Sequence, residues 1–104
     1  MNTQYGSKEN KSINTTEVLG GHSVPTRLYI DLMAHMETRM HGVAPDTLYT
    51  LKEMCDVVFW DGLNSKWLKC KAGRAFAHMV YQGHFPFEFV QYKRSPTKRY
   101  LLVQ

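Results

Sequence analysis

The chain has 104 residues, 43% of them hydrophobic, which is enough for one globular domain with a single modest core. Its net charge of +4 is unevenly divided: residues 1–63 carry five bases and eight acids, whereas residues 64–104 carry eight bases and one acid. There is no apolar run near the roughly 20 residues of a membrane helix, no signal-peptide core and no disulfide framework. We therefore expect a cytoplasmic protein whose basic part binds a polyanion such as nucleic acid.

Residues 1–22 differ in composition from the rest of the chain. Asn, Thr, Ser, Gly, Lys and Glu dominate this segment, and Gly20-Gly21 marks a break near its end. A segment of this kind buries too little apolar surface to offset the entropy lost on ordering. We expect a flexible N-terminal arm over residues 1–22 and one folded domain over residues 23–104.

A helical apolar pattern begins after Ser23. The pattern predicts a first helix over residues 24–41, and Gly42 ends it. The predicted helix carries a Met-rich stripe, Met33, Met36 and Met40. Such a stripe more often packs in the core than forms the contact between two protein molecules, and both alternatives stay open here. The apolar side chains recur every four residues, at Leu28, Leu32, Met36 and Met40.

Capping residues mark the next two helices. Thr50 and Glu53 have the spacing of a capping box, which predicts a second helix over residues 51–60. Ser65 is a good N-cap for a third helix over residues 66–82. Both helices carry an apolar face, so we expect them to pack with the first helix around one core.

The apolar pattern changes from helical to alternating after Gly83. Residues 87–93 and 99–103 read as two strands, and the Pro96 region between them reads as a loop. These features predict an antiparallel β-hairpin at the C-terminus.

Leu48-Tyr49 could supply a brief strand before the second helix. The order helix, short strand, helix, turn, helix, hairpin resembles the winged-helix superfamily, a helix-turn-helix variant with a β-hairpin wing. Gly62, Leu63 and Leu68 fit the turn pattern of that superfamily, whereas Val58 and Asp61 depart from it. The resemblance covers about residues 23–104 and implies an α+β fold. It also implies a three-helix winged helix-turn-helix with a C-terminal two-stranded β-hairpin.

The exposed face of the third predicted helix is a candidate DNA-contacting surface. Small side chains at Cys70, Gly73 and Ala77 would let the helix backbone approach a ligand closely. Arg74 is long enough to contact guanine through two hydrogen bonds. The alternative is helix packing beneath a solvated charged face. The candidate residues for the major groove are Lys66, Lys69, Lys71, Arg74 and Tyr81.

A second basic cluster lies at the predicted hairpin. In winged-helix proteins this hairpin touches the DNA backbone or the minor groove, so the resemblance implies that role here. A solubility device at an exposed tip is the alternative. The candidate phosphate-binding residues are Lys93, Arg94, Lys98 and Arg99.

The sequence argues against an enzyme. The five His have no zinc-ligand spacing, the acids are scattered, and Cys70 has no evident catalytic partner. We therefore expect no catalytic residues, no metal and no cofactor.

The sequence thus predicts a small winged-helix protein that binds double-stranded DNA, as a transcriptional regulator or as an accessory factor of a mobile element. Two symmetric half-sites would multiply its affinity, so we expect a homodimer. The alternative is a phage- or plasmid-type inhibitor or adaptor that binds an acidic host protein or a nucleoprotein complex through its basic face. RNA is a third partner that the sequence does not separate from DNA. The candidate protein-interface residues are Phe59, Trp60 and Trp67.

Overall fold

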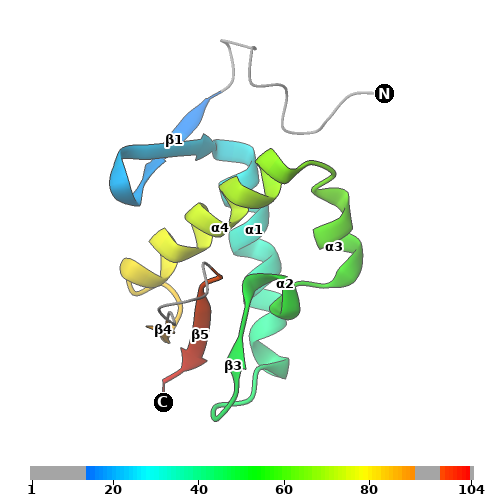
Figure 1. Ribbon diagram of the computed structural model, residues 1–104, viewed down its shortest axis with the longest axis vertical. Coiled ribbons are helices and arrows are strands. Elements are labelled where there is room, and N and C mark those ends of the chain that lie inside the picture. Colours follow the sequence, from blue (N-terminus) through cyan, green and yellow to red (C-terminus); the bar gives the residue numbers. More distant parts are fainter. Residues whose placement is uncertain (1–13, 91–96, 104) are drawn as a thin grey trace.

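The computed structural model describes residues 14–90 and 97–103. Helices and short strands share one core, with the long helices α1 and α4 crossing in the middle of the molecule (Figure 1). The predicted α+β class is confirmed. In the described part of the chain, no helix combines the length and apolarity needed to cross a membrane.

An N-terminal hairpin precedes the first helix. Strand β1 (Thr15–Val18) pairs antiparallel with β2 (His22–Pro25), through the turn η1 (Leu19–Gly21). Both glycines of the turn have positive φ, 76° at Gly20 and 75° at Gly21, which glycine adopts without steric cost. The two strands pack on α1 and α4, and Val18 and Val24 are buried.

The hairpin corrects the predicted flexible arm. Few of residues 15–22 are apolar, so their composition predicts an arm, yet pairing between β1 and β2 and the buried Val18 and Val24 hold this segment against the helices. The folded part of the chain therefore begins before residue 23. Residues 1–13 of the expected arm lie outside the described residues.

Helix α1 (Thr26–Arg39) starts two residues later than predicted, because Ser23, Val24 and Pro25 belong to β2. Leu28, Leu32 and Met36 are buried along it, as their spacing indicates. A 3-10 turn, η2 (Met40–Gly42), closes the helix. The methionine stripe therefore faces the core, and Met33 and Met40 pack at its edge.

The predicted second helix over residues 51–60 is wrong as a single helix. Strand β3 (Leu48–Tyr49) leads into α2 (Leu51–Met54), which the expected capping box of Thr50 and Glu53 begins. The chain becomes extended at Cys55 (ψ 148°), and α3 (Val57–Gly62) starts anew at Asp56. The Asp56 carboxylate accepts from the Val58 amide, while the Asp56 amide donates to His35 Nε2 on α1 at 3.0 Å.

Helix α4 (Lys66–Tyr81) is the longest element of the described chain and matches its prediction to within one residue. The Ser65 hydroxyl accepts from the Leu68 amide, and Gly83 ends the helix region with φ 80°. Its buried face carries Leu68, Ala72, Ala75, Phe76 and Met79.

A three-stranded antiparallel sheet closes the core. Strand β5 (Arg99–Leu102) lies between β3 and β4 (Phe87–Val90), so the sheet order is β3-β5-β4. Val90 pairs with Arg99, and Tyr49 pairs with Tyr100. The predicted C-terminal hairpin is present in these pairs, and residues 91–93 of its first strand lie outside the described residues.

An aromatic cluster joins this sheet to α4. The Phe76 ring centre lies 4.8 Å from that of Tyr100, in an edge-on arrangement, and 5.8 Å from that of Phe87. Tyr100 is only 1% exposed, and its burial raises the pKa of its phenol. Ring packing therefore holds the C-terminal hairpin against the buried face of α4.

Candidate nucleic-acid interface

An open groove of about 530 Å³ runs between α4, the α2–α3 region and the start of β5. Helix α4 lines it with its first two and a half turns, and Thr97 and Lys98 lie opposite on the approach to β5. The described residues around it are Thr50, Leu51, Lys52, Trp60, Lys66, Lys69, Cys70, Gly73, Arg74, Thr97, Lys98 and Tyr100.

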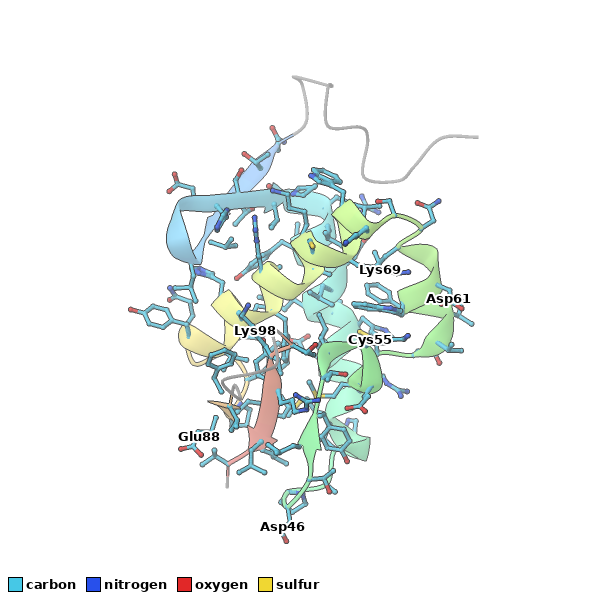
Figure 2. The ribbon with its side chains drawn as sticks, viewed as in Figure 1. Asp46, Cys55, Asp61, Lys69, Glu88 and Lys98 are labelled. Carbon is cyan, nitrogen blue, oxygen red and sulfur yellow. The ribbon has the colours of Figure 1, made fainter. Side chains whose placement is uncertain are left out.

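The charge of this groove is entirely positive over the described residues. Five bases line it and no acid does. Figure 2 shows Lys69 and Lys98 over the middle of the view, whereas the labelled acids Asp46, Asp61 and Glu88 lie towards its edges. Like charges gathered around one concave surface raise the local concentration of an oppositely charged ligand. The five bases are Lys52, Lys66, Lys69, Arg74 and Lys98.

The floor of the groove lets a ligand approach the α4 backbone. At Gly73, a Cβ atom would meet nothing within 4 Å among the described atoms, so this glycine faces open space. Cys70, one turn earlier, is exposed and small. The alternative in which Gly73 packs against another helix of the same chain does not apply here.

Trp60 positions one of the bases. Lys69 Nζ lies 5.9 Å from the centre of the Trp60 ring, and Trp60 itself packs at the edge of the core. A cation over an aromatic face is attracted by the ring quadrupole, by about 0.5–1 kcal/mol when exposed. The contact ties α4 to α3 and keeps the Lys69 ammonium beside the groove.

Lys71 lies away from the groove, in contrast to its neighbours in sequence. Its ammonium donates to the Ser23 carbonyl at 2.8 Å and lies 5.5 Å from the centre of the Trp67 ring. Lys71 was predicted to contact DNA, but in the structure its side chain links α4 to the N-terminal hairpin.

Arg74 does line the groove, and it also reaches the hairpin. Its Nη1 atom lies 2.8 Å from His22 Nδ1, which makes a hydrogen bond between residues 52 positions apart. Since the Arg74 side chain is exposed, this bond orients the guanidinium rather than burying it.

The remaining predicted nucleic-acid residues are dispersed. Tyr81 is 71% exposed, but it lies beyond the groove at the end of α4. Arg99 is half-buried on β5 and does not line the groove. Lys93 and Arg94 lie outside the described residues.

The predicted protein-interface residues are less exposed than expected. Phe59, Trp60 and Trp67 are half-buried and pack against the core. Phe59 stacks on His35 with ring centres 4.2 Å apart and planes 9° apart. The exposed apolar residues of α3 are instead Val57 (67%) and Val58 (76%).

Sequence reasoning missed Lys52 as a member of the site. In the sequence Lys52 is only one residue of a capped helix, yet in the structure it lies on the exposed side of α2, across the groove from α4. No local pattern in the sequence marks Lys52 as a groove residue. Only the pairing of β3 with β5 brings Lys52 and Lys98 to the same surface.

The described His, Cys, Asp and Glu side chains form no candidate metal centre, and one of the two cysteines is buried. Within 14–90 and 97–103, no three His, Cys, Asp or Glu side chains come together as a metal site would require. Burial raises the pKa of the Cys55 thiol to about 12, so that thiol is a poor nucleophile.

Comparison with known proteins gives no assignment. No family model, curated protein or solved structure matches this chain. The function proposed below therefore follows from the fold and from the chemistry of the groove.

Proposed function

We propose that this protein binds nucleic acid, with double-stranded DNA as its main ligand, and that it acts without catalysis. The observation that carries the proposal is the groove itself, where five bases and no acid among the described residues surround one open surface. Phosphates are the natural ligands of such a surface, because each neutralised phosphate releases condensed counterions.

The arrangement of elements supports a winged-helix mode of binding. The chain order α1, β3, α2–α3, α4, β4, β5 and the sheet order β3-β5-β4 agree with a helix-turn-helix followed by a wing. In that mode α4 is the recognition helix. Its 16 residues extend about 24 Å at 1.5 Å per residue, which suits a helix lying in the major groove.

The groove suggests separate roles for its bases. Lys98 and Lys52 lie on the two sides of the groove away from α4, where they would contact phosphates and fix the position of the protein. Arg74 is on α4 and is already oriented by His22, so it is the residue suited to reading a guanine edge. A small protein with these features would serve as a transcriptional regulator or as an accessory factor of a mobile element.

The test is binding of the purified protein to duplex DNA, single-stranded DNA and RNA over a range of salt concentrations. For duplex DNA we expect the logarithm of the affinity to fall linearly with the logarithm of salt, with a slope of roughly −4.5 if all five bases contact phosphates. An affinity for nucleic acid that is absent, or insensitive to salt, would contradict the proposal.

A second function is favoured by the exposed valines of α3. Val57 and Val58 present apolar side chains at the surface, which suits a protein partner. In this alternative the protein is an inhibitor or adaptor that docks on an acidic host protein through its basic groove, with these valines beside the contact. The same binding assay separates the two, because a protein-docking surface requires no salt-dependent affinity for nucleic acid.

A further inference from the structure

A second, smaller cavity continues the basic groove along α4. It has a volume of about 190 Å³ and lies over the last turn of the helix, at Ala77, Val80 and Tyr81. Lys98 and Tyr100 line both this cavity and the groove. The two are therefore neighbouring parts of one surface, with different chemistry.

The walls of this cavity are apolar and aromatic. Tyr81 (71% exposed), Phe89 (46%) and Leu19 (38%) come from α4, β4 and the turn of the N-terminal hairpin. The Phe89 ring centre lies 5.9 Å from that of Tyr100, which is almost fully buried, so Phe89 and Tyr81 form the exposed aromatic wall of the cavity. Ligand sites are typically concave and mostly apolar with a few polar groups, and this cavity has that character on a small scale.

The chemistry of the ligand follows from this juxtaposition. A cavity of about 150 Å³ with apolar walls is known to hold a benzene ring, so a volume of about 190 Å³ accepts one aromatic ring system. Lys98 supplies a single positive charge where the cavity meets the groove. A nucleotide combines these requirements, because it carries a flat ring next to an anionic phosphate.

The base that enters must be unpaired. Within a duplex the base faces are stacked and only their edges are accessible, so a ring reaches a side pocket only from a single-stranded end or after extrusion. Stacking of a base on protein aromatic rings is independent of its sequence, since every base has a π-face.

We infer that the cavity between Tyr81, Phe89 and Leu19 binds an unpaired nucleobase, so that the protein prefers duplexes that carry a single-stranded end. This inference rests on the proposed nucleic-acid binding and adds to it a class of substrate. Phosphates next to the unpaired base lie along Lys98 and the groove, while the base stacks on the aromatic wall.

The experiment compares the affinity of the protein for three duplexes: a blunt one, the same duplex with a short thymidine overhang, and the same duplex with an overhang of abasic nucleotides. The abasic overhang keeps the extra phosphates and lacks the bases. Overhangs are placed at the 5′ end in one set of duplexes and at the 3′ end in another. The thymidine overhang should raise the affinity roughly 5- to 150-fold over the blunt duplex, as expected for one stacked base. The abasic overhang should add much less.

Two variants connect this preference to the cavity. Tyr81→Ala and Phe89→Ala should each lower the gain from the thymidine overhang and leave the affinity for the blunt duplex unchanged. Ile30→Ala is the matched control, because Ile30 is 56% exposed on α1 and lines neither cavity. If Phe89→Ala reduces thermal stability, the Tyr81→Ala result decides alone.

The outcomes separate failure of this inference from failure of the proposed function. Equal, salt-dependent affinity for blunt and thymidine-overhang duplexes would overturn the unpaired-base site and leave nucleic-acid binding intact. Absence of binding to every duplex would overturn both. A wild-type dimer that Tyr81→Ala converts to a monomer would assign the cavity to contact between two copies, and would also overturn the inference.

Discussion

Lys71 Nζ donates a hydrogen bond of 2.8 Å to the Ser23 carbonyl, and this bond fastens α4 to the N-terminal hairpin. The Trp67 ring lies beside the same ammonium, one turn earlier on the helix. Two residues before Lys71 in the sequence, Lys69 lines the basic groove instead. Adjacent bases of one helix therefore have different tasks, and this difference yields the first prediction.

We predict that Lys71→Gln lowers the free energy of unfolding by about 1 kcal/mol, the usual contribution of one partly buried hydrogen bond, and leaves DNA affinity unchanged. Lys69→Gln is its matched partner: it should flatten the salt dependence by roughly one unit, and its effect on stability is limited to loss of the contact with the Trp60 ring, about 0.5–1 kcal/mol. Chemical denaturation and salt-dependent binding measure the two effects. A Lys71→Gln protein with weakened, salt-flattened binding would place Lys71 at the ligand.

The two bases across the groove from α4 should act through phosphates. We predict that the double substitution Lys52→Gln, Lys98→Gln weakens binding to every duplex sequence alike and flattens the salt slope by roughly two units. Arg27→Gln is the control for each single lysine substitution, because it also removes one positive charge, and Arg27 pairs with Asp31 on α1 and does not line the groove. Equal effects of Arg27→Gln and of either single lysine substitution would show that only net charge matters.

Arg74 should confer sequence preference. We predict that Arg74→Ala costs about 1–3 kcal/mol on a preferred duplex site and little on other sequences, because a bidentate contact to guanine is lost. His22→Ala removes the partner that orients Arg74 but leaves the guanidinium in place. This variant should therefore lose less affinity for the preferred site than Arg74→Ala does. Binding of selected and random duplexes measures both. Uniform weakening across all sequences would indicate a phosphate contact for Arg74.

The two cysteines provide a direct probe of the groove. Cys70 is exposed on its floor, whereas Cys55 is buried with its pKa raised to about 12. We predict that a maleimide modifies Cys70 alone in the folded protein, and that saturating duplex DNA slows this modification several-fold. Mass spectrometry of the digested protein locates the label. Modification of Cys70 at the same rate with and without bound DNA would exclude the groove as the binding surface.

His35 should make stability depend on pH. Burial, and secondarily the charge of Arg39, lower the pKa of His35 below its usual 6.5, so the folded state favours the neutral ring that accepts from the Asp56 amide. The unfolded chain takes up the proton more readily as pH falls. The contribution of His35 to the free energy of unfolding is therefore fully present above about pH 6.5, and it is lost as the pH falls through the lowered pKa of the folded state.

The substitution His35→Gln tests this dependence, since Gln keeps a hydrogen-bond acceptor and does not titrate. We predict that the wild-type free energy of unfolding falls more steeply than that of the variant as pH drops below 6.5. The other four histidines are common to both proteins and cancel in the comparison. Parallel pH profiles would show that His35 titrates equally in the folded and unfolded states.

Local sequence determined much of the secondary structure of this protein. The boundaries of α4, the capping box of Thr50 and Glu53, and the apolar stripe of α1 were all predicted, because each depends on residues within one or two turns. The change to an alternating pattern after Gly83 likewise predicted the C-terminal hairpin. The basic bias of residues 64–104 indicated Lys66, Lys69, Arg74 and Lys98 before any geometry was known.

Contacts between distant residues decided the rest. The N-terminal hairpin exists because Val18 and Val24 are buried and its strands pack on α1 and α4, which composition alone does not reveal. The predicted second helix breaks at Asp56, where the backbone amide bonds to His35, 21 residues earlier. Pairing of β3 with β5 places Lys52 and Lys98 at one groove. The hydrogen bond from Lys71 to the Ser23 carbonyl holds that side chain away from the groove. Helix periodicity fixes which residues share a face, but only packing between elements selects the partner that each side chain meets.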